Sequence, residues 1–133
     1  MDYMLDTNVC IAIMKGHSGL WSRLSEVSPD DIGISSIVLA VLSYGVSKSA
    51  HRTQNQLALA DFCSVCRLLD WPYAAADTYG EIRTFLEKRG CIIGANDLLI
   101  ASHVKYLNAT LVTNNLREFT RVPGLAVEDW ISH

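Results

Sequence analysis

Short apolar runs alternate along the chain with longer stretches whose apolar residues recur at helical spacing. The short runs predict strands at residues 3–5, 32–35, 67–70 and 110–113, and a short edge strand at 125–127. The longer stretches predict helices at residues 9–15, 20–26, 36–48, 52–66, 73–89 and 97–107. Gly16, Gly90 and Asn108 follow three of these helices, as helix stops do. The alternation predicts an α/β fold, a three-layer α/β/α sandwich around a mostly parallel sheet of four or five strands.

The composition narrows the class of protein. The chain has 133 residues, of which 50% are hydrophobic and 19% are charged, so a disordered chain or a coiled coil is excluded. No linker or repeat divides it, and we expect a single domain over residues 1–133. The apolar runs are far shorter than the ~20 residues of a membrane span. The N-terminus lacks the basic and apolar regions of a signal peptide.

The cysteines and histidines do not predict a metal centre. Cys63 and Cys66 have the spacing of a redox or zinc pair, but no second pair accompanies them. We interpret the four cysteines as reduced thiols of a cytoplasmic protein. The histidines are scattered, and His103, in a predicted helix, is interpreted as an ordinary surface or core residue.

Three oxygen-bearing side chains stand where a parallel sheet places its ligands, beyond the carboxyl ends of the strands. Asp6 follows the first strand, Asp97 lies in the first turn of a helix, and Asn115 follows the fourth strand. Each alone is typical of a cap or a turn. Together they predict convergence on one hard cation such as Mg²⁺, which can activate water and stabilise charge on a phosphate.

Four motifs resemble one protein family. Residues 4–8, Met-Leu-Asp-Thr-Asn, resemble the opening motif of PIN domains. Three further stretches resemble VapC-type toxins of bacterial toxin–antitoxin systems, namely residues 34–39 with 44–49, residues 94–101, and residues 111–119 followed by 122–125. The matches occur in order and span nearly the whole chain.

The resemblance implies a PIN-like fold and a Mg²⁺- or Mn²⁺-dependent endoribonuclease that cleaves structured RNA, often a tRNA. It also implies a VapB-like antitoxin as partner and a homodimer or toxin–antitoxin hetero-oligomer. Operator DNA would be bound only through the antitoxin, and no membrane is involved. Carried over by position, Asp6, Asp97 and Asn115 match catalytic residues of the family, and Asp6 and Asp97 match metal ligands. The net charge of -3 excludes non-specific coating of RNA and is compatible with local RNA contacts.

One position departs from the family pattern. The family carries a glutamate where this chain has Val41, and many relatives carry another where it has Ser43. Losing a ligand or an orienting acceptor predicts an enzyme that is weakened or inactive. Asp77 and Glu81, four residues apart on a predicted helix, are candidates for a replacement carboxylate.

Two other functions remain open at this point. A catalytically dead PIN-domain module would sequester antitoxin or act as a corepressor. The apolar helices before residue 66 would then form an antitoxin groove or a dimer face, with Trp21 as an anchor. A phosphorylation-switched receiver domain would use Asp70, but such domains need two acids after the first strand, where Asp6 stands alone, and a late lysine.

Overall fold

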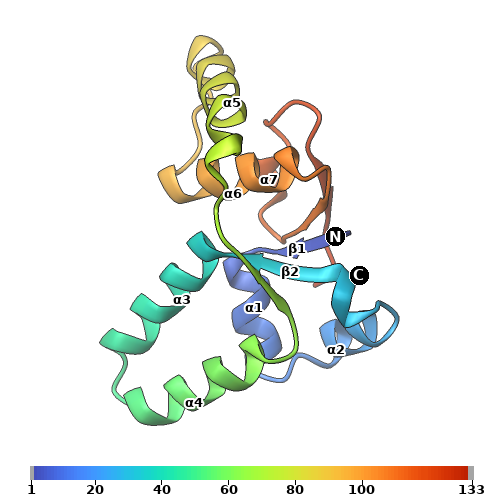
Figure 1. The fold of residues 1–133 in the computed structure, drawn as a ribbon, viewed down its shortest axis with the longest axis vertical. Coiled ribbons are helices and arrows are strands. Elements are labelled where there is room, and N and C mark those ends of the chain that lie inside the picture. Colours follow the sequence, from blue (N-terminus) through green and yellow to red (C-terminus); the bar gives the residue numbers. More distant parts are fainter. Residues whose placement is uncertain (1, 132–133) are drawn as a thin grey trace.

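The computed structural model describes residues 2–131; Met1 and residues 132–133 of the expected domain lie outside the described residues. The strands are β1 (Tyr3–Leu5), β2 (Ile32–Ser35), β3 (Arg67–Leu69), β4 (Thr110–Val112) and β5 (Ala126–Glu128). All neighbouring strands are parallel, in the order β3-β2-β1-β4-β5 (Figure 1). The predicted parallel α/β fold is confirmed.

The helices cover both faces of this sheet. They are α1 (Thr7–Met14), α2 (Ser18–Ser25), α3 (Ser36–Lys48), α4 (Arg52–Cys63), α5 (Ala76–Lys88), α6 (Ala95–Tyr106) and α7 (Leu116–Phe119). From β1, the chain first forms β2 and then β3 on one side of β1. It then crosses back and forms β4 and β5 on the other side of β1. Because parallel crossovers are right-handed, this reversal puts α1 to α4 on one face and α5 to α7 on the other. Figure 1 shows the two groups on opposite sides of the strands.

Most boundaries agree with the predicted ones to within two residues, and three differences are larger. Helix α4 ends at Cys63 rather than residue 66, and the Ser64 hydroxyl there donates to the Asp61 carbonyl at 2.6 Å. The helix predicted from residue 73 begins as a 3₁₀ turn over Tyr73–Ala75. Helix α7 was not predicted, because four residues are too few to show helical periodicity. Asn108, with φ of 54°, is left-handed as expected.

The pairing of the two central strands positions the site. Leu5 of β1 lies opposite Val112 of β4, and both side chains are buried. The next residues, Asp6 and Thr113, therefore leave the sheet side by side at its carboxyl edge. The Asp6 N–H donates to the Val112 carbonyl at 2.9 Å and continues the ladder by one bond.

Candidate active site

Asp6 is held in a fixed orientation. Its side chain is buried, and Oδ1 accepts a hydrogen bond from the Thr7 N–H at 2.8 Å, which caps α1. Oδ2 accepts from the Thr113 hydroxyl at 2.8 Å, and that hydroxyl oxygen accepts from the Asn115 N–H at 2.9 Å. Burial raises the pKa of Asp6, and the bonds from Thr113 and Thr7 oppose the rise. Thr113 thus connects two of the predicted site residues.

Asp97 lies in the first turn of α6 and faces two other carboxylates. Its half-buried side chain is hydrogen-bonded to Glu118, and the negative charge of Asp6 also acts on it. Burial, this hydrogen bond and the neighbouring charges together raise the pKa of Asp97 to about 7. Near neutral pH, Asp97 therefore retains a proton that an isolated aspartate would have lost.

Glu118 belongs to the same cluster, although sequence reasoning missed it. Hydrogen bonds from Asp97 and from Asn115, whose Nδ2 donates to Oε2 at 3.2 Å, lower the pKa of Glu118, as does the charge of Arg121. Within this pair Asp97 is therefore the weaker acid and Glu118 the stronger one. One feature of the sequence could have identified Glu118. It lies three residues after Asn115, a spacing that places both residues on one side of a helical turn.

Val41 lines a cavity that reaches Thr7, the residue that follows Asp6. Val41 is half-buried on α3, and the cavity has a volume of about 490 Å³. Ile11 and Val46 make other parts of that wall apolar. Position 41 therefore shares a cavity wall with Thr7, and a valine there supplies no oxygen.

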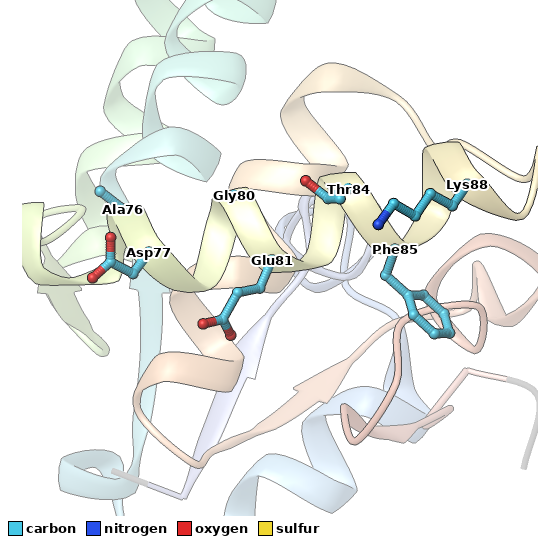
Figure 2. A pocket seen from close by; sticks show the side chains of 7 residues that line it. All are labelled: Ala76, Asp77, Gly80, Glu81, Thr84, Phe85 and Lys88. Carbon is cyan, nitrogen blue, oxygen red and sulfur yellow. The ribbon is translucent and has the colours of Figure 1, made fainter.

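The proposed replacements for the missing carboxylate do not reach the site. Asp77 and Glu81 are exposed on α5, where they line a different cavity (Figure 2). Neither is among the groups that shift the pKa of Asp6 or of Asp97. This possibility was wrong, because the acids of α5 that share a helix face point away from α6.

The PIN domain family matches residues 3–125. The chain is 52% identical over 132 residues to Ribonuclease VapC2 of Rickettsia felis, with 98% of each chain covered. The chain belongs to the VapC family of PIN-domain ribonucleases. It is 38% identical to the tRNA(fMet)-specific endonuclease VapC of Salmonella typhimurium, again with 98% of each chain covered.

The fold agrees with that membership. The crystal structure of VapBC2 from Rickettsia felis, bound to a DNA fragment from its promoter, contains a chain that superposes with a TM-score of 0.94 and 49% identity. The superposition covers 98% of this chain and 99% of that one. The VapC resemblance inferred from the four motifs is confirmed over the full length.

PIN-domain ribonucleases are metal-dependent, and the donors of this VapC chain suit a hard cation. Asp6, Asp97, Asn115 and Glu118 offer only oxygen and amide groups. Among residues 2–131, no three His, Cys, Asp or Glu side chains are arranged to surround an ion. One or two carboxylates completed by water is the arrangement that Mg²⁺ favours. A cation would also replace the proton that Asp97 retains, so the site fits a divalent metal.

Two other residues with side chains that can carry chemistry, Cys66 and His103, are not arranged as reactive or metal-binding groups. Burial raises the pKa of the Cys66 thiol to about 11, so the thiolate that redox or zinc chemistry needs is scarce at neutral pH. His103 is buried, and its Nδ1 lies 2.9 Å from the Ser35 hydroxyl, as expected for a core histidine. Over residues 2–131, no helix is both long and apolar enough to cross a membrane.

The receiver-domain alternative is not supported by the topology. Asp70 follows β3, which is the edge strand of the sheet, and β2 separates that strand from β1. The Asp70 side chain is exposed, whereas Asp6 is buried with Thr113. A phosphoacceptor needs neighbouring acids that bind its cation, and here those acids gather around Asp6.

Proposed function

We propose that this VapC chain is the toxin of a type II toxin–antitoxin system, an endoribonuclease for structured RNA such as tRNA, and that Val41 weakens it. The carrying observation is that Asp6, Asp97 and Glu118 shift one another's pKa near the carboxyl edge of a parallel sheet, with Asn115 hydrogen-bonded to Glu118. The name of the Salmonella typhimurium relative supports a tRNA substrate. Reduced thiols and a toxin's RNA target support a cytoplasmic location.

Each residue of the cluster has a distinct role in this proposal. Asp6 and Asp97 would hold Mg²⁺ or Mn²⁺, which supplies an activated water and stabilises charge on the scissile phosphate. Thr113 fixes the Asp6 carboxylate through its 2.8 Å hydrogen bond. Asn115 orients Glu118 through its amide. A metal bound by Asp97 would displace the proton of its carboxyl group to solvent.

The function is tested by RNA cleavage with the unaltered chain at high protein concentration. We expect slow cleavage of structured RNA in Mg²⁺ or Mn²⁺ and none in a chelator. The matched control is Asp6→Asn, which keeps the size of the side chain and should abolish the residual activity. If the unaltered chain and Asp6→Asn cleave equally, the activity is a contaminant and the proposed site is wrong.

A binding module is the second candidate, favoured by one observation on the α1 to α4 face. Three neighbouring cavities on this face have lining residues in common. The cavity beside Val41 shares Met14 and Ala58 with the next, which in turn shares Trp21 and Val65 with a third. Together they line a mostly apolar groove over α1 to α4, and Trp21 is 47% exposed in it.

This groove suits an apolar segment of an antitoxin. The related Rickettsia felis structure is a VapBC2 complex bound to promoter DNA. We therefore assign the groove to a VapB-like antitoxin, through which this chain would reach operator DNA. With no detectable cleavage, the chain would still act through this surface as an antitoxin sink or corepressor.

Trp21→Ala is expected to weaken antitoxin binding by about 30-fold, because a central aromatic anchor contributes about 2 kcal/mol or more. Titration calorimetry with the cognate antitoxin measures the change. Tyr106→Ala, which truncates an exposed aromatic residue on α6, is the matched control and should bind normally. Equal affinities of both variants and the unaltered chain would place the antitoxin elsewhere.

A further inference from the structure

The cavity that Val41 lines differs in charge from the rest of the apolar groove. It lies between α1, α3 and α4 (Figure 1), and among the described residues Lys15 and Lys48 line it without any aspartate or glutamate. The next cavity is lined by Asp61 and by no basic residue that the structure describes, and the cavity beyond it has no charged residue in its described lining. Trp21, the anchor assigned to the antitoxin, lines those two cavities and not the first. This end of the groove is therefore positively charged.

Both lysines of this cavity are available to bind an anion. Within residues 2–131, neither forms an ion pair with a carboxylate. The wall between them is apolar, with Ile11, Met14 and Leu42 among its residues. Two unpaired cations and an apolar wall suit a ligand that has a negative charge and a flat apolar body, as a nucleotide does. The volume of about 490 Å³ lies within the ~300–1,000 Å³ of sites for small molecules.

Tyr44 supplies an aromatic surface in this cavity. It is one of the lining residues, and it is 64% exposed. The Lys48 ammonium lies 4.7 Å from the centroid of the Tyr44 ring, where cation–π attraction holds the two side chains together. Unpaired bases of RNA stack on exposed aromatic rings, and lysines contact the phosphates beside them. Tyr44 and Lys48 therefore suit one unstacked nucleotide.

The Asn55 amide, which also lines the cavity, is oriented by its neighbours. The Ser49 hydroxyl donates to the Val46 carbonyl at 2.8 Å and lies 3.0 Å from Asn55 Nδ2. Because a hydroxyl has one hydrogen to donate, Asn55 is the donor in the second bond, and this fixes which end of the amide carries the oxygen. Within the described residues, Asn55 Oδ1 accepts no hydrogen bond. A free acceptor favours cytosine, which carries an amino group, over uracil, which carries an oxygen at that position.

Thr7 connects this cavity to the proposed metal ligand. It lines the cavity, and its N–H donates to Asp6 Oδ1 at 2.8 Å. An RNA chain held at Asp6 has nucleotides on both sides of the phosphate that is cut. One of these nucleotides would enter the neighbouring cavity when no antitoxin covers it.

We propose that this cavity binds one unpaired nucleotide of the RNA substrate in the antitoxin-free chain. The base stacks on Tyr44, the Asn55 carbonyl oxygen accepts a hydrogen bond from an amino group of the base, and Lys15 and Lys48 contact phosphates. The inference rests on the RNA substrate of the proposed function. It adds a preference for cytosine over uracil in the nucleotide bound there.

The base preference is tested with two labelled single-stranded RNAs of equal length, an oligocytidine and an oligouridine. Fluorescence anisotropy in EDTA measures their binding to the unaltered chain without cleavage. Oligocytidine should bind about fivefold more tightly, which is the effect of one net hydrogen bond. Asn55→Ala should remove this difference between the two RNAs.

Two further variants test the stacking and the phosphate contacts. Tyr44→Ala should weaken oligocytidine binding about 10-fold, whereas Tyr44→Phe, which keeps the ring, should retain it. Tyr73→Ala is the matched control, because Tyr73 is 93% exposed and precedes α5. Lys15→Ala should reduce the slope of log affinity against log salt by about 0.7, the contribution of one phosphate contact to a single strand. Lys88→Ala, at the exposed end of α5, should leave that slope unchanged.

Several results would overturn the inference. These are no binding of either RNA, equal binding of both by the unaltered chain, or oligocytidine binding that Tyr44→Ala and Lys15→Ala leave unchanged. If Tyr44→Ala weakens binding of the cognate antitoxin but not of oligocytidine, the cavity belongs to the antitoxin surface and the inference is wrong. The proposed function fails separately, in the cleavage comparison of the unaltered chain with Asp6→Asn.

Discussion

Val41→Glu is expected to raise metal-dependent RNA cleavage at least ~10–100-fold over the unaltered chain, the factor by which the loss of supporting groups lowers metal affinity or activity. The valine lines a cavity that also includes Thr7, the residue after Asp6 in the chain. A carboxylate there would add a third negative charge to the ionised Asp6 and Glu118 and a further oxygen for the metal or its water. The half-buried position and the open cavity leave room for the longer side chain.

The measurement is the initial rate of cleavage of structured RNA at several Mg²⁺ and Mn²⁺ concentrations. Ser47→Glu is the control, because it adds the same charge to α3 at an exposed position that does not line the cavity. Its rate should match that of the unaltered chain. No metal-dependent cleavage by Val41→Glu would argue against the enzyme and leave the antitoxin-binding module as the function.

Asp97→Asn is expected to stabilise the metal-free chain at about pH 8 and to remove its response to divalent metal. The pKa of Asp97 is about 7 in the folded chain against 3.8 for an unperturbed aspartate, so between these values the folded state holds a proton that the unfolded state has lost. Its stability therefore falls as pH rises through this range. Asparagine has no charge to bury beside Asp6 and Glu118, so it avoids that loss.

Thermal unfolding at about pH 5 and pH 8 measures the effect. The Tm of Asp97→Asn should exceed that of the unaltered chain at pH 8 and approach it at pH 5, where Asp97 is protonated. Mn²⁺ should raise the Tm of the unaltered chain at pH 8 and leave the variant unchanged, because a ligand that binds only the folded state stabilises it. Asp30→Asn controls for loss of one exposed negative charge. The same Tm difference at both pH values would show that Asp97 holds no shifted proton.

The largest features of the fold follow from local sequence. Buried parallel strands need continuous apolar runs, and the helices that cover them need one apolar face. The strands at residues 3–5, 32–35 and 110–112 could therefore be predicted from the sequence alone. The rule that ligands gather at the carboxyl edge then pointed to Asp6. Helix α7 was missed because a four-residue helix carries no periodic signal.

The details of the site depend on contacts between distant segments. The Thr113 hydroxyl donates a hydrogen bond to Asp6, which is 107 residues away in the chain. No local pattern around either residue predicts that hydrogen bond. Glu118 resembles an ordinary surface acid until α7 brings it to Asp97. Position 41, in contrast, was identified in the sequence, because Val41 departs from the family motif there. The structure shows in addition that Val41 lines a cavity together with Thr7.

The sequence by itself therefore determined the parallel α/β architecture and the VapC family, and it predicted three oxygen-bearing residues of the candidate site, because these depend on residue order and spacing. Only the tertiary structure decided that the pKa of Asp97 is raised and that of Glu118 lowered, because burial and through-space charge set a pKa. It also joined three cavities into one mostly apolar groove and placed Lys15 and Lys48 at one end of it. Those properties belong to surfaces built from several elements, and they exist only once the helices have packed on the sheet.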